Sequence, residues 1–295
     1  MLQVTLKLSG HVTVNRLSIT IPMPPMATSS SLGSLAGLNL DTLMANIQRQ
    51  QSGRLGNLAQ QEQSYTAKLS GYGKVINALS SLKTAAGGLG KTGLFDPVGN
   101  DPATARPDAG KIKSAVKAFV ASYNAAQKVV SDLGAYDKDA KAGAALFGDK
   151  ALSDVQSQLR KAFDNIPGGS LADMGLSFDK DGALQLDEAR LDGAIQSNPK
   201  GVKQFFVGDD GTSGLSGRMS ALTTTLTGKN SPLTQASDKA SDMLALLGRN
   251  QDEEADRVTA LMASYRAQFQ RLSLLYNDMG VASAFMSDQL AVLKG

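Results

Sequence analysis

Apolar side chains recur with helical spacing at both ends of the chain, from about Leu38 to Leu89 and from about Ala236 to Leu293. In each segment they follow one another in alternating steps of three and four residues, which places them in a narrow stripe along one side of a helix. The two stripes comprise Leu55, Leu58, Glu62, Tyr65, Leu69, Tyr72, Ile76 and Leu79, and Val258, Leu261, Tyr265, Gln268, Leu272, Leu275 and Met279. Because such a stripe needs a partner, we expect the two helices to pack on each other or on copies from neighbouring subunits.

Shorter helices are predicted between the two long segments. Apolar spacing predicts helices over Lys111–Gly134 and Lys150–Asn165. Further helices are predicted over Asp187–Ile195, from Pro199 onward with Asn198 as the cap, and over Leu215–Leu226.

One β-hairpin is predicted in the middle region. Leu176–Asp179 and Ala183–Leu186 alternate between apolar and polar residues on either side of Lys180-Asp181-Gly182, with the glycine at the left-handed position of the turn. The predicted fold is therefore mainly α. Long N- and C-terminal helices form an antiparallel coiled coil or bundle, with a small α+β middle region that contains the hairpin.

We expect five parts along the chain. Residues 1–26 are predicted to be a non-native or disordered extension, with Met26 as the native start and a short genuine arm as the alternative. Gln3–Leu8 alternates like a strand, and no charged segment followed by an apolar one predicts a secretory signal. The other parts are an N-terminal coiled-coil helical segment (27–95), a linker rich in proline and glycine (96–110), a helical middle domain with the hairpin at 176–186 (111–232), and a C-terminal coiled-coil helical segment (233–295).

The composition removes several classes of function. The chain has no cysteine and a single histidine, His11, so thiolate sites and most histidine chemistry are excluded. The net charge is +3 and the basic residues are scattered, which disfavours nucleic-acid binding. No run of eighteen apolar residues occurs, so membrane insertion is not expected. Aromatic residues make up 5% of the chain, which suits a helical core of smaller side chains.

Two motifs resemble ligand-binding loops. Ala85–Thr92 resembles a phosphate-binding loop, but Ala85 replaces the first glycine and the predicted context is a helix followed by a linker. Ser177, Asp179, Asp181 and Glu188 have the spacing of a calcium loop, but Ser177 replaces the first acidic ligand and strands flank it. A glycine-rich helix end and an Asp-Gly turn account for these residues without a ligand.

No catalytic constellation stands out. The acidic runs Asp187-Glu188 and Asp252-Glu253-Glu254 fall on predicted helices, where we interpret them as solvated faces. We therefore predict no catalytic residue, no cofactor-binding residue and no metal ligand, and the chain is not expected to be an enzyme.

Several short motifs follow one another after Ala27. They are Ser31–Asp41 (SLGSLAGLNLD), Leu69–Lys74 (LSGYGK), Phe119–Asn124 (FVASYN), Leu146–Asp149 (LFGD), Gly175–Gly182 (GLSFDKDG) with Leu186-Asp187, Phe205-Phe206, and Tyr265–Phe269 (YRAQF). In this order they resemble the flagellar hook-associated protein 2 family, the filament cap proteins of the bacterial flagellum. The resemblance covers nearly everything from Ala27 onward.

The resemblance implies a structural assembly factor. Members of this family form a ring-like homo-oligomeric cap at the distal tip of the filament, where they promote flagellin polymerisation and hence motility. The resemblance implies secretion through the flagellar export route, an export chaperone that binds the C-terminal helix, and hook–filament junction proteins as neighbours. No cofactor is implied.

The chain departs from the family in one respect. Members normally carry mostly β head domains between the first helical segment and the helix with the Phe-Val-x-x-Tyr-Asn motif, whereas this chain has only the linker 96–110 there. The family's head contributes to the plate of the cap and, in some members, to cell adhesion. An alternative function is therefore a headless, export-competent fragment that binds the export chaperone or axial subunits as an assembly regulator.

The candidate assembly residues are apolar positions at the outer ends of the two long helices. They are Leu40, Met44, Ile47, Leu272, Leu275, Met279, Phe285 and Leu290. We expect them to form the seam through which copies of the chain, or other axial subunits, associate.

Overall fold

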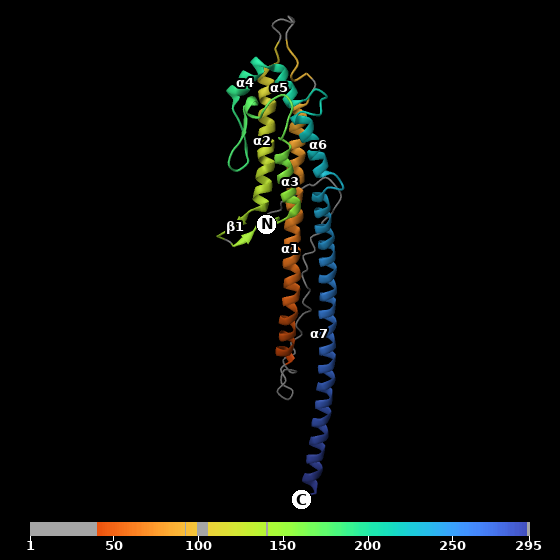
Figure 1. The fold of residues 1–295 in the computed structure, drawn as a ribbon. Helices are drawn as coiled ribbons and strands as arrows, with labels where there is room; N and C mark the ends of the chain where they lie inside the picture. The colour runs from red at the N-terminus through yellow and green to blue at the C-terminus, as the bar shows by residue number, and fades with distance from the viewer. Residues whose placement is uncertain (1–39, 92, 99–105, 140, 294–295) are drawn as a thin grey trace. The chain divides into compact units, whose positions relative to one another are not determined.

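The computed structural model describes residues 40–91, 93–98, 106–139 and 141–293 (Figure 1). The described chain is mainly α, as predicted, and falls into two compact units. One unit is Gln51–Val258, and the other contains residues 40–50 and 259–293. The predicted strand at Gln3–Leu8 and the predicted start at Met26 lie outside the described residues.

The two long helices are confirmed. Helix α1 covers Leu40–Leu89 and helix α7 covers Pro232–Val292. Helix α1 is continuous through its glycines, and an added Cβ at Gly53 or Gly73 would meet nothing within 4 Å. Within Gln51–Val258 the two helices run antiparallel (Figure 1), and Gln251 Nε2 donates a hydrogen bond to Glu62 Oε2 at 2.9 Å. None of the described helices is both long enough and apolar enough to cross a bilayer.

The shorter helices match their predictions to within a few residues. They are α2 (Ala109–Gly134), α3 (Lys150–Lys161), α4 (Glu188–Ser197), α5 (Pro199–Phe206) and α6 (Leu215–Thr227). The 3-10 turn η1 (Ala172–Met174) was not predicted. Helix α2 begins two residues earlier than predicted, because the Asp108 carboxylate caps it by accepting the Lys111 backbone N–H at 3.1 Å. Helix α3 ends earlier than predicted, and Asn165 adopts a left-handed φ of 54°.

The predicted hairpin is present, and a second one accompanies it. Strands β3 (Leu176–Phe178) and β4 (Leu184–Leu186) pair antiparallel, and Gly182 has the expected positive φ of 81°. The second hairpin, β1 (Tyr136–Asp137) with β2 (Ala142–Gly143), was not predicted, since two-residue strands leave no alternating pattern. Both strands of this second hairpin are exposed.

The core of Gln51–Val258 forms around the Phe119–Asn124 motif of α2. Phe119 and Tyr123 are fully buried, and the Tyr123 and Phe178 rings both meet Phe163 edge-on with centroids 5.1 Å apart. Asn124 joins α2 to β4, because its amide donates to the Leu184 carbonyl at 2.8 Å and accepts the Leu184 N–H at 2.7 Å. Burial raises the pKa of Tyr123 to about 12, so this phenol stays neutral.

The C-terminal end of α1 has a packing role. The helix continues to Leu89, so the glycine-rich residues around Gly87 are not a loop between a strand and a helix. Ser216 of α6 donates a hydrogen bond to the Ala86 carbonyl at 2.7 Å, and a Cβ at Gly90 would lie 2.4 Å from the Ser216 hydroxyl. The glycine therefore permits α6 to approach α1, and the resemblance to a phosphate-binding loop is not supported.

Candidate assembly surface

The predicted seam residues all lie in the unit that contains residues 40–50 and 259–293. The side chain of Leu40 is not described, and those of Met44 and Ile47 are half-buried. The others are exposed on α7, with exposed fractions between 45% and 64%, and they are Leu272, Leu275, Met279, Phe285 and Leu290. Every residue from Leu274 to Ala291 is exposed, so this stretch of α7 is uncovered on all sides.

Large apolar side chains lie on two sides of this stretch. A helix turns by about 100° per residue, so residues three, four and seven apart share a side. The first stripe consists of Leu272, Leu275, Tyr276, Met279, Met286, Leu290 and Leu293. Phe285 belongs instead to a second stripe with Leu274 and Val281, on roughly the opposite side of the helix.

This geometry corrects the sequence interpretation in one respect and extends it in another. Phe285 does not share a side with Met279 and Leu290, because it is six and five residues away from them. Sequence reasoning followed a single stripe of three- and four-residue steps and therefore missed five exposed apolar residues. These are Leu274, Tyr276, Val281, Met286 and Leu293. The second stripe has a signal of its own, since Leu274, Val281 and Phe285 are spaced by seven and four residues.

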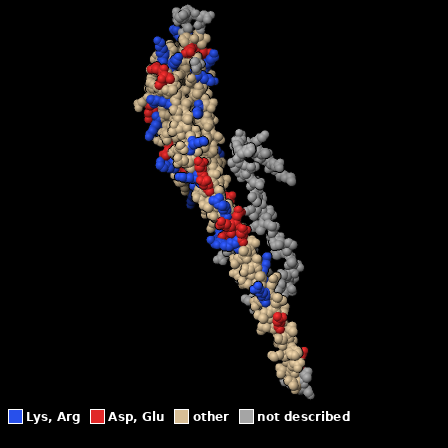
Figure 2. Space-filling model, turned by 90° about the vertical axis from the view of Figure 1, so that its right-hand side faces the viewer, with Lys and Arg blue, Asp and Glu red and all other residues tan. Residues whose placement is uncertain are grey.

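Few charges accompany the two stripes. Between Leu272 and Leu293 the charged residues are Asp278 and Asp288, so this stretch has a net charge of −2. Figure 2 shows the end of α7 as a mostly uncharged surface with isolated acidic side chains. An exposed apolar helix of this kind is typical of a surface that another protein covers.

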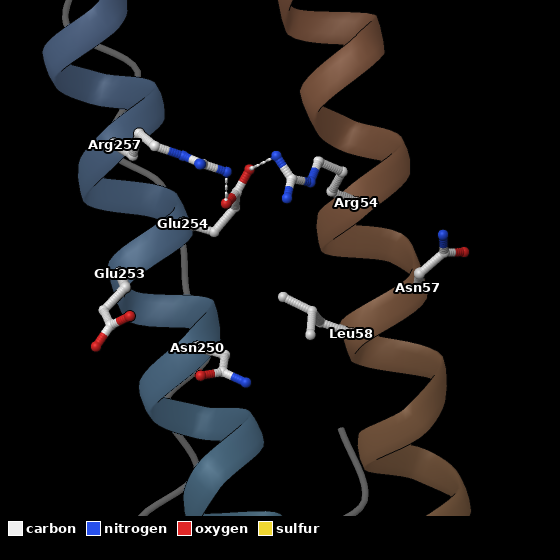
Figure 3. A pocket seen from close by; sticks show the side chains of 7 residues that line it. All are labelled: Arg54, Asn57, Leu58, Asn250, Glu253, Glu254 and Arg257. Atoms are coloured by element: carbon white, nitrogen blue, oxygen red, sulfur yellow. Dashed lines mark hydrogen bonds and ion pairs between the residues drawn. The ribbon is translucent and has the colours of Figure 1, made fainter.

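A polar cluster lies between α1 and α7 within Gln51–Val258 (Figure 3). Asp252 and Glu253 are exposed, as expected of a solvated face, but Glu254 is buried, which corrects the interpretation for that residue. Its Oε2 accepts a hydrogen bond from Arg257, and its Oε1 lies 3.7 Å from Arg54 Nη1. The Glu254 side chain is 10% exposed, whereas those of Arg54 and Arg257 are 63% and 54% exposed.

The hollow around Glu254 has a volume of about 560 Å³ and is mostly polar. Asn57, Leu58, Asn250 and Glu253 complete its lining (Figure 3). No group of three or more acidic, histidine or cysteine side chains suited to a metal occurs among the described residues. Both oxygens of the buried carboxylate face arginines, so the cluster joins the two helices by charge.

The calcium-like spacing is used within the hairpin turn. Asp179 Oδ1 accepts the backbone N–H groups of Asp181 at 3.0 Å and Ala183 at 2.8 Å. The hydrogen bond from Ala183 is the main cause that lowers the pKa of Asp179. Asp187 caps α4 by accepting the Arg190 N–H at 3.1 Å, and Glu188 pairs with Lys117 at 2.8 Å.

Comparisons with known proteins agree on one family. The model of the family described as flagellar hook-associated protein 2 C-terminus matches residues 99–280, which is more than half of the chain. The flagellar hook-associated protein 2 of Escherichia coli K12 is 29% identical over 194 residues, covering 62% of this chain and 42% of that protein. The B-type flagellar hook-associated protein 2 of Pseudomonas aeruginosa is 32% identical over 198 residues, covering 64% of this chain and 40% of that protein.

The chain spans about two fifths of the length of these curated relatives. A crystal structure of the flagellar cap protein FliD from Escherichia coli, comprising domains D1-D2-D3, is 28% identical over the aligned part. The alignment covers 46% of this chain and 38% of that chain, with a TM-score of 0.41, which is below the level that establishes a common fold.

Proposed function

The chain belongs to the flagellar hook-associated protein 2 family, and we propose that it is a structural protein of the bacterial flagellum that caps the filament. The family match carries this proposal, and the exposed apolar stretch of α7 supports it, because a helix uncovered on all sides needs partners. The protein acts as a secreted homo-oligomer at the distal tip of the filament. No catalytic role is proposed.

The mechanism rests on packing. The seam residues of α1 and α7 associate with other copies and with flagellin, so that the cap holds incoming flagellin while it polymerises. The C-terminal part of α7 serves an export chaperone before secretion, and hook–filament junction proteins are neighbours at the start of assembly. The proposal keeps the domain limits predicted from the sequence, namely terminal helical segments at 27–95 and 233–295 and a middle domain at 111–232. The terminal helical segments form the part of the cap that contacts other axial subunits.

A second candidate follows from the short connection between α1 and α2. Only residues 90–108 separate the two helices, and Val98 pairs with Arg106 there through a backbone hydrogen bond of 2.9 Å. A chain without a head domain at this place is suited to act as an assembly regulator that binds the export chaperone or axial subunits. Chaperone binding without restored filament growth would favour this candidate.

Complementation tests the cap function. The chain is produced in a bacterium that lacks its cap protein, and swimming motility and flagellin leakage into the medium are measured. Motility is expected to return, with less leakage. Met279→Asp in the first stripe is expected to abolish the rescue, whereas Ala284→Asp, which adds the same charge between the two stripes, is expected to retain it. Secreted chain without any rescue would refute the cap function.

A further inference from the structure

A groove runs between α1 and α7 within Gln51–Val258, separate from the polar cluster around Glu254. Its volume is about 650 Å³. The apolar part of its lining comes from Tyr65 and Tyr72 of α1 and from Ala236, Ala240, Met243 and Leu246 of α7. An apolar groove between two helices is the type of surface that takes the apolar side of a third helix.

Positive charge surrounds this groove. Lys68, Lys239 and Arg249 line it, and no ion pair to them is recorded among the described residues. Lys68 Nζ lies 5.2 Å from the centre of the Tyr65 ring. Asp149 also lines the groove, but its carboxylate accepts the Tyr72 hydroxyl at 2.6 Å and the Leu152 N–H at 3.0 Å.

Exposed large apolar side chains occur in the groove and on the loop that contributes Asp149 to it. Leu246 is 41% exposed, and the loop that supplies Asp149 to the groove also carries the exposed Phe147. The Phe147 ring packs against Tyr136 of β1 with centroids 5.3 Å apart. Apart from Val98, these are the exposed large apolar side chains among the described residues of Gln51–Val258. Of these, Leu246 lines the groove itself, and an exposed large apolar side chain in a groove is typical of a protein-binding surface.

We propose that this groove binds the second stripe of α7 from another copy of the chain. That stripe is Leu274, Val281 and Phe285. Its charged neighbours are Asp278 and Asp288 within the stripe and Arg271 three residues before it, with a net charge of −1. The groove lining carries three cations and two carboxylates, Asp149 and Asp242, so its net charge is +1, whereas the stretch Leu272–Leu293 carries −2. Apolar area and charge are therefore complementary.

The contact makes the assembly directional. Groove and stripe are different surfaces, so each copy offers one of each, and such head-to-tail contacts generate rings when the rotation closes. The first stripe of α7 remains free for the seam. This inference deepens the proposed cap function and rests on it only for its biological role, because self-association is a property of the purified chain.

Charge reversal in the full chain tests the contact. Sedimentation velocity over a range of concentrations measures self-association of the wild-type chain, of Lys239→Glu/Arg249→Glu and of Asp278→Lys/Asp288→Lys. Each double variant is expected to associate about tenfold or more weakly than wild type, since like charges then face each other. An equimolar mixture of the two is expected to associate again, because the acidic groove of one meets the basic stripe of the other. Lys74→Glu/Lys83→Glu, on the exposed side of α1 outside the groove, is the matched control and is expected to behave as wild type.

Cysteine crosslinking locates the contact. Because the chain has no cysteine, one chain with Leu246→Cys and one with Phe285→Cys form a mixed disulfide only between chains. This pair is expected to crosslink faster than Leu246→Cys with Met279→Cys, which lies in the first stripe. Equal rates, a monomeric wild-type chain, or reversed-charge variants that associate like wild type would overturn the proposal. Restored motility alongside any of these results would leave the cap function standing and reject this contact alone.

Discussion

Replacing the buried Glu254 by leucine tests how the terminal helices are held together. Glu254 lies seven residues after the buried Leu247 and seven before Leu261, so it occupies a core position in the apolar repeat of α7. A carboxylate at such a position is costly to bury, and its two arginine partners offset this cost only in part. We expect Glu254→Leu to stabilise Gln51–Val258.

The magnitude follows from the exposure of the partners. Burying a leucine side chain contributes about 1.5–3 kcal/mol. Against this stands the loss of the contacts with Arg54 and Arg257, which together are worth about 1 kcal/mol because both guanidinium groups are more than half exposed. The arginines stay hydrated after the change, so no buried charge is left without a partner. The net gain is therefore about 0.5–2 kcal/mol.

Urea unfolding followed by circular dichroism at 222 nm measures the effect. The midpoint is expected to rise at an unchanged slope, and the melting temperature to rise by about 1–8 °C for a unit of this size. Glu253→Leu, at an exposed position that lines the same hollow, is the control and is expected to change stability by less than about 0.5 kcal/mol. If Glu254→Leu lowered stability by about 1 kcal/mol or more while the control stayed neutral, the buried carboxylate would be a net stabilising group and the reasoning would be wrong.

Three further predictions concern the middle region and are tested by the same unfolding measurements. Asn124→Leu removes both hydrogen bonds to the Leu184 backbone and should lower the free energy of unfolding by about 1–3 kcal/mol. Asn124→Asp keeps the acceptor and should lower it less. Equal losses would show that the hydrogen bonds contribute little. Gly175→Ala should lower the free energy of unfolding by about 1–3 kcal/mol, because Gly175 has a φ of 72° and an added Cβ would lie 2.4 Å from the Asp187 carbonyl oxygen. Gly193→Ala is the control, since an added Cβ there would meet nothing within 4 Å. Backbone N–H groups of Thr212 and Ser213 lower the pKa of Asp210, so its folded value lies below its unfolded value of about 3.9. The stabilisation from Asp210 is therefore complete above about pH 4 and is lost as the pH falls through the folded pKa. The difference in melting temperature between wild type and Asp210→Ala should shrink below about pH 4. A difference that stays constant with pH would contradict this assignment.

Local signals explain which helices were predictable. Asn198 caps α5 by accepting the Gly201 N–H at 3.0 Å and Pro199 follows at the first helical position, so the start of this helix is encoded in two adjacent residues. The hairpin at 176–186 was predictable for the same reason, since its alternation and its Gly182 turn are both local. In contrast, β1 and β2 have two residues each, and Phe147 packs closely on Gly143, where any Cβ would lie 2.6 Å from the phenylalanine. That contact joins residues whose sequence has no strand pattern.

The candidate site was predictable in part. The exposure of Leu272, Leu275 and Met279 agrees with an uncovered seam, because a stripe that continues past its packed partner must end in solvent. Glu254 was misjudged because a run of three acidic residues on a helix points in three directions, and only one of them faces α1. Burial of a single member of such a run depends on the neighbouring helix, which the charge pattern does not reveal.

The two stripes of α7 also bear on how the protein works. Helices that are uncovered on all sides are marginal in water, and most helical stability comes from packing of an apolar side. Residues 51–258 bury their own core, whereas the stretch from Leu274 to Ala291 has apolar side chains on two sides and buries neither. Two apolar sides require two partners, and one chain-to-chain contact covers only one of them. A surface of this kind is therefore suited to an axial assembly, in which each copy binds a neighbour with one stripe and a further subunit with the other.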